Sequence, residues 1–294
     1  MTDIEIESEQ SNAYTQAYPP EAIPALAALL DALRERGVRY CLWKSNLRLA
    51  HALTGQTDLD LLIDRRDSGA FREVLVHHPV KPMVPSPHAT YPGMHHLLGF
   101  DSATGQLFHL HVHYQMVLGE QYVKNHRFPM EQDFLGSIRV LDGVPVPSAA
   151  LELAILAVRA LLKYRARDVV KDVLNIRTPG LAADIRNEIG WLLQQTSVEE
   201  VRAELNAAEA PLPVESICDF LEIAQGAPRS GYKLLRLRGR LRRTVEGMQR
   251  GGRLPARATY LRAAWRNRRR FRRGRSDYYA MSPVGGGFGV ALIG

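Results

Sequence analysis

Cysteine is scarce in this sequence, and long apolar runs are absent from it. The 294 residues include two cysteines, Cys41 and Cys218, which are too few for a disulfide framework. The sequence has no basic-then-apolar leader and no run of about 18 apolar residues that would predict a transmembrane segment. We therefore expect a cytoplasmic protein whose thiols are buried and reduced.

Acidic residues are nearly missing from one segment. Residues 229–275 contain eighteen Lys and Arg residues and one acid, Glu246, so this segment carries +17 and the remainder −10. The composition predicts one or two basic helices, broken at Gly251-Gly252, that bind nucleic acid, an anionic membrane surface or the acidic remainder of the chain. The segment lacks the aromatic interleaving of a single-strand-binding groove. Aromatic residues that would anchor an interfacial helix are Tyr260, Trp265 and Phe271.

The most informative pattern is the acid and apolar alternation in residues 57–64, Thr-Asp-Leu-Asp-Leu-Leu-Ile-Asp. On a β-strand, Asp58 and Asp60 project from one face while the intervening leucines project from the other. Two such carboxylates can converge on a divalent ion, as metal-assisted phosphoryl chemistry requires. The alternative is a half-exposed edge strand with solvated acids. In the metal-free protein the two carboxylates are expected to repel, so replacing either by Asn is predicted to relieve strain.

A short strand and a polar turn precede this pattern. Residues 38–43 predict a strand, and Lys44-Ser45-Asn46 leads into a predicted helix over 47–53 with Ser45 or Asn46 as its N-cap. A triphosphate can bind the unpaired N–H groups at such a helix start, and Lys44 would add a positive charge. Lys44, Ser45 and Asn46 are therefore the candidate nucleotide-binding residues.

The order of strand, turn, short helix and D-x-D strand resembles the nucleotidyltransferase (polymerase-beta-like) fold. The resemblance implies that Asp58 and Asp60 are metal ligands for Mg²⁺ or Mn²⁺, with a nucleoside triphosphate as substrate. Ser45 falls where the family has the serine of its Gly-Ser turn. The glycine is missing here, and without it the close approach of the backbone to phosphate is less assured.

Three histidines alternate along a predicted hairpin. Its strands, 97–100 and 107–116, are joined by a turn-rich hexapeptide, and the second strand places His109, His111 and His113 on one face. The resembling family carries a third carboxylate on such a strand, and His111 best matches that position. An imidazole suits Zn²⁺ or Mn²⁺ better than Mg²⁺. His111 or His113 is alternatively a catalytic base, or the histidines fill a polar, partly wet face.

Composition, periodicity and the family resemblance together divide the chain into five parts. We predict an α+β protein with a nucleotidyltransferase-like mixed sheet and flanking helices, followed by a helical lobe and a basic helical linker. The predicted parts are a disordered acidic tail (1–19), the nucleotidyltransferase-like domain (20–147), the helical lobe (148–228), the basic linker (229–278) and the start of a truncated P-loop domain (279–294).

Several further segments carry expectations about the site. The proline-rich stretch 79–92 predicts a functional loop over it. Arg159 and Lys163 predict a surface salt-bridge ladder with Asp168 and Asp172 on a helix that begins at residue 149. Candidates to reach phosphate or a glycan acceptor are Lys124, Asn125 and Arg127.

Motifs over nearly the whole chain resemble bacterial proteins in which an uncharacterised nucleotidyltransferase-like domain precedes a thymidylate-kinase-like domain. The motifs are W-K-S-N at 43–46, G-Q-T-D-L-D at 55–60, L-G-F-D at 98–101, H-x-H-Y at 111–114 and V-A-L-I-G at 290–294. Such proteins accompany cell-surface polysaccharide synthesis in some cases, so the resemblance implies a glycan-related acceptor. The chain stops before the G-K-[ST] of a P-loop, and we expect no kinase activity from this sequence.

Three functions follow from these patterns. The leading one is metal-dependent transfer of a nucleoside monophosphate, with Asp58 and Asp60 on the metal, Lys44, Ser45 and Asn46 on phosphate, and His111 or His113 completing the site. The second is a degenerate nucleotidyltransferase fold that binds an acceptor for an adjacent kinase domain. The third is binding of nucleic acid or an anionic membrane through residues 229–275.

Overall fold

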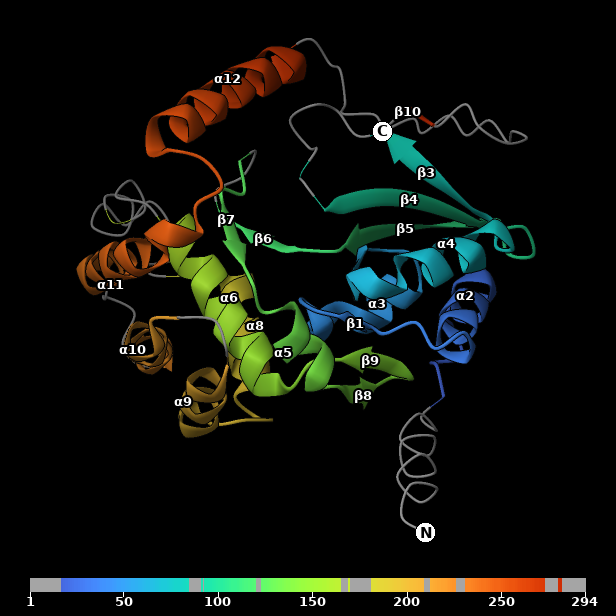
Figure 1. The fold of residues 1–294 in the computed structure, drawn as a ribbon, viewed down its shortest axis with the longest axis horizontal. Coiled ribbons are helices and arrows are strands. Elements are labelled where there is room, and N and C mark those ends of the chain that lie inside the picture. The colour runs from blue at the N-terminus through green and yellow to red at the C-terminus, as the bar shows by residue number, and fades with distance from the viewer. Residues whose placement is uncertain are drawn as a thin grey trace.

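The computed structural model describes residues 17–84, 91, 93–119, 123–164, 169, 181–208, 212–225, 231–272 and 280–281. These residues form a mixed sheet with flanking helices and a helical lobe (Figure 1). The predicted α+β fold is confirmed. Of the predicted acidic tail, residues 1–16 lie outside the described part of the chain.

A six-stranded sheet forms the centre of the molecule. In spatial order its strands are β1 (Tyr40–Leu42), β2 (Leu59–Ile63), β5 (Gln106–His113), β4 (Met94–Asp101), β3 (Val80–Val84) and β10 (Ala280–Met281). Strands β2 and β5 are parallel, and every other neighbouring pair is antiparallel. Because paired residues project to the same face, this register decides which side chains of β2 meet those of β5.

Helices cover one face of this sheet. They are α2 (Pro24–Glu35), α3 (Leu49–Leu53) and α4 (Ser68–Val76), all on the same side in Figure 1. Their apolar side chains form a core with Leu59, Leu61 and Ile63, the apolar set of β2. The period of two therefore leaves the acidic set of β2 on the opposite face.

A glycine turn places the first acid. Gly55 ends the turn after α3 with a φ of +74°, and a Cβ atom there would lie 2.5 Å from the carbonyl oxygen of Leu107. Both the left-handed backbone and this close approach to the start of β5 require glycine. The turn therefore sets Asp58 beside β5 as the chain enters β2.

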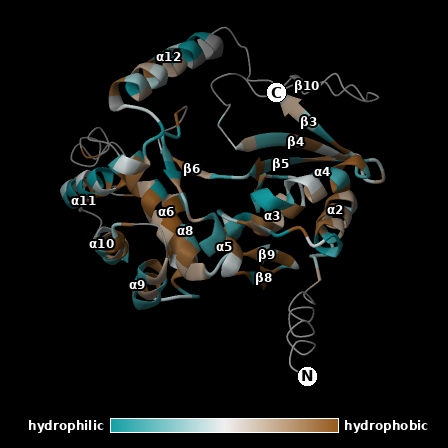
Figure 2. Cartoon of the chain, viewed as in Figure 1, coloured by the Kyte–Doolittle hydropathy of each residue, from teal (hydrophilic) through white to brown (hydrophobic). Residues whose placement is uncertain are grey.

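The second half of the chain is a helical lobe built around α6 (Ala149–Lys163). Its other helices are α5 (Glu131–Gly136), α8 (Ala183–Leu192), α9 (Val198–Ala207), α10 (Val214–Gln225) and α11 (Gly231–Thr244). The apolar residues of α6 are buried, and Figure 2 colours much of this helix brown, the colour of hydrophobic residues. Two small ribbons, β6–β7 (Met116–Leu118, His126–Phe128) and β8–β9 (Arg139–Leu141, Val144–Val146), connect sheet and lobe.

The basic segment contains two different helices. Helix α11 packs on the lobe through Leu234, Leu237 and Leu241, all buried. The 3-10 helix η3 (Val245–Met248) then leads to α12 (Arg253–Arg272), which stands away from the sheet and the rest of the lobe in Figure 1. Because one face of α11 packs in the core of the lobe, α11 is part of the lobe. Of the two helices, α12 is the one that matches the predicted basic linker. No described helix has an apolar stretch of the length that crosses a membrane.

Two predicted elements differ in the structure. The predicted helix over 47–53 is split into a 3-10 helix η1 (Asn46–Arg48) and α3, with a second 3-10 helix, η2 (Arg65–Asp67), before α4. Part of the expected proline-rich loop is strand β3, because Pro82 needs no donor at that position of the ladder. Its remainder, 85–90 and 92, lies outside the described residues.

The end of the chain is described at two residues. Ala280 and Met281, in the segment predicted to begin a P-loop domain, pair with β3 at the sheet edge. The other residues of 279–294 lie outside the described part, and a P-loop domain there stays a prediction.

Candidate functional site

Acidic and histidine side chains meet on the face of the sheet that α2 and α4 leave uncovered. The parallel register pairs Asp60 with His111, so the alternating acids of β2 face the alternating histidines of β5. His109 Nδ1 lies 2.8 Å from Asp58 Oδ1, and His113 Nε2 lies 3.2 Å from Asp60 Oδ1. His111 sits between the two acids, with Nε2 3.7 Å from Asp58 Oδ2 and Nδ1 3.4 Å from Asp60 Oδ1. The structure thus brings together all four predicted catalytic residues.

The two acids have different surroundings. Asp58 is half-exposed, at 48% of its side chain, whereas Asp60 is 14% exposed and forms an ion pair with Lys44. Burial alone would raise the pKa of Asp60, but Lys44 and the neighbouring histidines hold it well below its ordinary value. Burial would also raise the pKa of Asp58, but the hydrogen bond from His109 and the charge of His111 leave it below its ordinary value. Both side chains are therefore carboxylates at neutral pH.

His113 and His111 differ in what they can do chemically. Burial lowers the pKa of His113 to about 4, and its ring packs edge-on against Trp43 at 5.2 Å between centroids. His113 is therefore neutral near pH 7 and donates its Nε2–H to Asp60. The Nε2 atom of His111 is buried and has no hydrogen-bond partner among the described residues. An unsatisfied imidazole nitrogen beside a carboxylate is available to a metal ion or a proton.

A fourth histidine was missed in the sequence analysis. His96 lies on β4 directly opposite His111, and its Nδ1 is 3.3 Å from His109 Nε2. The predicted hairpin already implied this position. Asp101 pairs with Gln106 across the turn, and the residues five positions further from the turn on each strand are His96 and His111. We call Asp58, Asp60, His96, His109, His111 and His113 the acid–histidine face.

The predicted phosphate-binding turn is occupied by internal contacts. Asn46 is 2% exposed; its backbone N–H donates to Glu152 Oε1, and its Nδ2 donates to Glu152 Oε2 and Leu42 O, each at 2.9 Å. The prediction that Asn46 binds phosphate is wrong for this conformation, because its donors are already used. Asn46 instead fixes the turn to α6. Burial raises the pKa of Glu152 to about 6, against the two hydrogen bonds from Asn46.

Ser45 and Lys44 lie at the site, but the side chain of Ser45 does not cap a helix and Lys44 is paired with a carboxylate. Ser45 has a φ of 65°, the left-handed conformation that glycine adopts without cost, and its side chain forms no cap hydrogen bond. The glycine-like position of this turn is therefore residue 45. Lys44 contacts Asp60 and lies over the ring of Trp43, 4.9 Å from its centroid. Its ammonium group is the counter-ion of Asp60.

Cations from three parts of the chain gather behind Asp60. Burial, together with the charges of Lys44, Arg159 and Lys163, lowers the pKa of Lys124 to about 7, while Asp60 opposes these effects. We call Lys44, Lys124, Arg159 and Lys163 the cation group. Arg159 and Lys163 were predicted to be a surface ladder with Asp168 and Asp172, which lie outside the described residues. The other two loop candidates bind elsewhere: Asn125 donates to Gly251 O at 2.8 Å, and Arg127 pairs with Glu131 at 3.4 Å.

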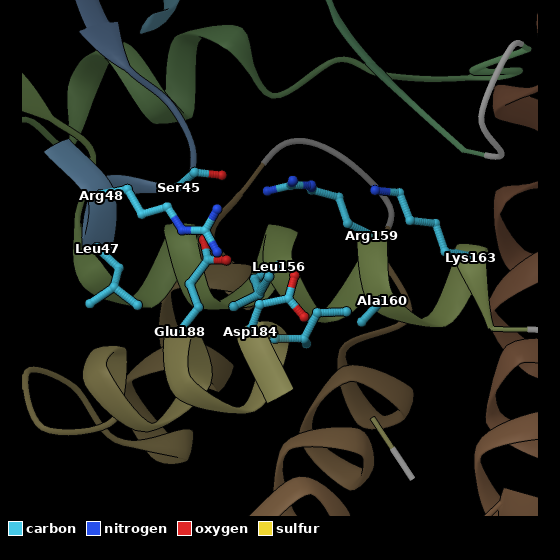
Figure 3. Close-up of a pocket in the computed structure, with 10 residues that line it drawn as sticks. Ser45, Leu47, Arg48, Leu156, Arg159, Ala160, Lys163, Asp184 and Glu188 are labelled. Atoms are coloured by element: carbon cyan, nitrogen blue, oxygen red, sulfur yellow. The ribbon is translucent and has the colours of Figure 1, made fainter. Parts of the chain in front are cut away.

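A pocket of about 230 Å³ adjoins the cation group. Figure 3 shows Arg159 and Lys163 projecting from α6 across the pocket toward the Ser45 turn, with Arg48 close to Glu188. Its lining residues are Ser45, Leu47, Arg48, Leu156, Arg159, Ala160, Lys163, Asp184, Ile185 and Glu188. Among the described residues, Arg159 Nη1 has no hydrogen-bond partner although it is buried. A guanidinium whose Nη1 atom is buried without a partner, beside the ammonium group of Lys163, is suited to an anion.

Comparisons with known proteins add little to this geometry. No family model matches the chain, and no curated protein matches it. Among solved structures, the chain is similar to the crystal structure of JHP933 from Helicobacter pylori at 10% sequence identity and a TM-score of 0.31, over 79% of this chain and 99% of that one. We draw nothing about fold or function from a similarity this low.

Proposed function

We propose that this protein transfers a nucleoside monophosphate from a nucleoside triphosphate to an acceptor, using the acid–histidine face and the cation group together. One observation carries the proposal: two ionised carboxylates and an unsatisfied imidazole nitrogen converge from β2 and β5, close to several cationic side chains. Phosphoryl chemistry needs both parts, because the substrate is a polyanion and charge builds up in its transition state.

The donor set on the face fits a divalent ion. Asp58 and Asp60 are the proposed ligands, with His111 in the position of a third ligand, and this mixed oxygen and nitrogen set favours Mn²⁺ over Mg²⁺. When bound, such an ion would polarise a phosphoryl oxygen and neutralise developing charge. For the triphosphate to bind, the Lys44 ammonium group would have to leave Asp60. It would then exchange the carboxylate for a phosphate as its anionic partner.

The chain's own residues supply the rest of the chemistry. Lys44, Lys124, Arg159 and Lys163 bind and orient the phosphates, and the Ser45 turn borders the pocket that receives them. His113 holds Asp60 in place through its Nε2–H and, being neutral, takes no proton at pH 7.

The wider setting is proposed from the sequence resemblance. It comprises a glycan-related acceptor, a thymidylate-kinase-like domain beyond the described residues, and a cytoplasmic location. The cytoplasm supplies nucleoside triphosphates and keeps thiols such as the buried Cys41 and Cys218 reduced.

The test combines binding and transfer. Mn²⁺ with a nucleoside triphosphate at millimolar concentration is expected to raise the melting temperature, because a ligand that binds only the folded state stabilises it. With labelled triphosphates and a bacterial glycan-precursor extract as acceptor, the wild type is expected to incorporate label. Asp60→Asn should lose about 100-fold or more of this transfer, as removal of a group that stabilises the transition state does.

The matched control is Asp219→Asn, an equivalent change at a half-exposed acid on α10 that pairs with Arg240. It should keep both the thermal shift and the transfer. Absence of any nucleotide-dependent shift in the wild type would contradict the proposal. A shift without transfer would favour the second function, a binding module.

Two contacts already favour that module: Lys44 occupies Asp60, and Asn46 is locked on Glu152.

A separate observation favours binding of an anionic membrane surface by α12. This helix has eight arginines and no acids, and its large exposed side chains Leu254, Leu261 and Trp265 recur at i, i+7 and i+11, on one face. An apolar stripe bordered by arginines is the pattern of an interfacial helix, whereas nucleic-acid binding needs no exposed leucines. We therefore propose that α12, rather than the whole of residues 229–275, contacts the membrane.

Vesicles test this second candidate. Binding to phosphatidylserine vesicles is expected at about 20 mM salt and should weaken at about 300 mM salt. Trp265→Ala in the full chain should weaken vesicle binding several-fold, whereas Tyr232→Ala, at an exposed aromatic of α11, should leave it unchanged. Equal loss in both variants, or binding to duplex DNA but not to vesicles, would contradict the candidate. Deleting residues 229–275 is a poor test, because it would also remove the buried leucines of α11.

A further inference from the structure

We propose that His96, His109 and His111 form a site for Zn²⁺ or a similar nitrogen-preferring transition-metal ion. The three side chains each offer one ring nitrogen, and these nitrogens lie within 4.8 Å of one another. They come from the neighbouring strands β4 and β5, in the central part of the sheet. Strand-borne ligands are held more rigidly than ligands on loops.

The spacing of the nitrogens suits a tetrahedral ion. Zn–N bonds of roughly 2.0–2.1 Å at tetrahedral angles place two ligand nitrogens roughly 3.3 Å apart. His96 Nδ1 and His109 Nε2 are 3.3 Å apart. The ring of His111 stands close to both others, at centroid distances of 4.6 Å from His96 and 4.5 Å from His109. A small rotation of this ring would complete three ligands and leave the fourth position open to water or substrate, as in catalytic zinc sites.

The surroundings resemble those of a metal-binding histidine set. His109 donates its Nδ1–H to Asp58 at 2.8 Å, which fixes the tautomer that leaves Nε2 as the electron-pair donor. His111 Nδ1 lies 3.4 Å from Asp60 Oδ1, and its Nε2 is buried without a hydrogen-bond partner among the described residues. Each of these two histidines therefore lies beside a carboxylate, although His111 shares Asp60 with His113 and Lys44, and such partners raise the basicity of the ligand.

The chemistry of the ligands selects the class of ion. Neutral imidazoles bind Zn²⁺, Cu²⁺ and Ni²⁺ well and Mg²⁺ or Ca²⁺ poorly. In this site Asp58 and Asp60 accept hydrogen bonds from histidines, whereas in the proposed transferase site they hold the ion themselves. The inference shares His111 with the proposed function but does not rest on it, since zinc binding requires no nucleotide.

A hydrogen bond is the alternative explanation of the short His96–His109 distance. One ring N–H can donate to the other ring across 3.3 Å without any metal. Such a pair predicts no affinity for zinc beyond that of surface histidines. Metal titration therefore separates the two explanations.

The experiment is a titration of the chelator-stripped full chain with Co²⁺ and Zn²⁺ in the absence of nucleotide. Co²⁺ is expected to give the visible absorption of a four-coordinate site with three nitrogen ligands, and one equivalent of Zn²⁺ should bleach it. His96→Asn should weaken Zn²⁺ binding by more than about 100-fold. Asp58→Asn, which removes only the partner of His109, should weaken it by about 10–100-fold.

The matched control is His95→Asn. His95 is the neighbouring residue on β4 but is exposed on the opposite face, where its ring contacts Tyr114. It should bind Zn²⁺ like the wild type. Melting in chelator shows whether each variant is folded, and the cobalt spectrum of the wild type tests the site without any substitution. A wild type without this spectrum, or equal zinc affinity in His95→Asn and His96→Asn, would overturn the inference.

The same titration distinguishes this inference from the proposed function. Asp60→Asn should abolish nucleotide transfer yet retain Zn²⁺ binding within about tenfold, the lower limit of an outer-partner effect. Zinc binding in a protein that never transfers nucleotide would leave the inference standing and the proposed function refuted. Nucleotide transfer in a protein that does not bind Zn²⁺ would refute the inference and leave the proposed function standing.

Discussion

The acid–histidine face and the cation group lie side by side, yet they are built in opposite ways. The face consists of alternate residues on three neighbouring strands, so the period of each strand and the register between strands place every member. The cation group comes from the end of β1, a loop before β7 and the helix α6, with no local pattern in common. A regular element thus shows its chemistry in the sequence, whereas a site assembled from distant segments depends on how they pack.

The ion pair between Lys44 and Asp60 joins these two parts, and breaking it gives the largest expected change in stability. Asp60→Asn would leave Lys44 buried without its counter-ion, so we expect the free energy of unfolding in chelator to fall by about 3 kcal/mol. Asp58→Asn is the matched control. Its carboxylate is half-exposed and pairs with His109, so its loss should cost about 1 kcal/mol or less.

Urea unfolding measures both variants, and a Lys44→Met change in the Asp60→Asn background should recover part of the loss. This expectation reverses the one from the sequence alone, that either substitution relieves repulsion. Lys44 and the histidines already supply the positive charge and the hydrogen-bond donors that the two acids need. An Asp60→Asn protein as stable as the wild type would show that the two parts are not coupled.

A smaller effect is expected at Glu152, which anchors the turn that carries Lys44. Its pKa is raised from 4.5 to about 6 by burial, so between these pH values the folded state binds this proton more tightly than the unfolded state. The stabilisation is present below the unfolded pKa and is lost as pH rises through the folded value, by about 2 kcal/mol in all.

Glu152→Gln should flatten this pH dependence and also cost about 1 kcal/mol at low pH, because an amide has one acceptor oxygen for the donors of Asn46. Urea unfolding at several pH values between 4.5 and 7 provides the measurement. Glu204→Gln serves as the control, since that carboxylate accepts from Ser148 away from the turn. If the free energy of unfolding of Glu152→Gln depends on pH as in the wild type, other acids must cause the dependence. Glu188 is one such acid, because burial also raises its pKa.

The smallest effect concerns Lys124 and sharpens the role of the cation group. Burial lowers the pKa of Lys124 to about 7, so its charge is lost as pH rises above neutrality. Triphosphate affinity should therefore decrease several-fold between pH 7 and pH 8.5, up to the limit of about tenfold per pH unit for one proton. Lys124→Arg keeps its charge and should make the affinity nearly independent of pH.

Fluorescent nucleotide binding at several pH values measures this dependence. In the protein without nucleotide the sign for stability is opposite: the contribution of Lys124 is complete above its ordinary pKa of 10.5 and is lost as pH falls through about 7. Nucleotide binding that is equally flat in the wild type and in Lys124→Arg would remove Lys124 from the phosphate site.

Much of the fold and one half of the site were predictable from local patterns. The D-x-D alternation placed Asp58 and Asp60 on one face because successive side chains of a strand point to opposite sides. The same period aligned the histidines of β5, and the turn before them also defined the position of His96, although that step was not taken. The α+β composition followed from these strands and from the apolar periodicity of the helices.

Only the tertiary structure decided which partners these residues meet. Asn46 and Glu152 are 106 residues apart, and no local pattern could show that a buried carboxylate would occupy the predicted phosphate-binding turn. Lys44 pairs with Asp60 because β1 and β2 are adjacent and antiparallel, so the chain leaving β1 passes the acid. The sequence of helix α11 indicates a basic helix without a core face, but three of its four leucines are buried in the lobe. Side-chain direction is a local property of the backbone, whereas burial and charge pairing depend on segments that become neighbours only when the chain has folded.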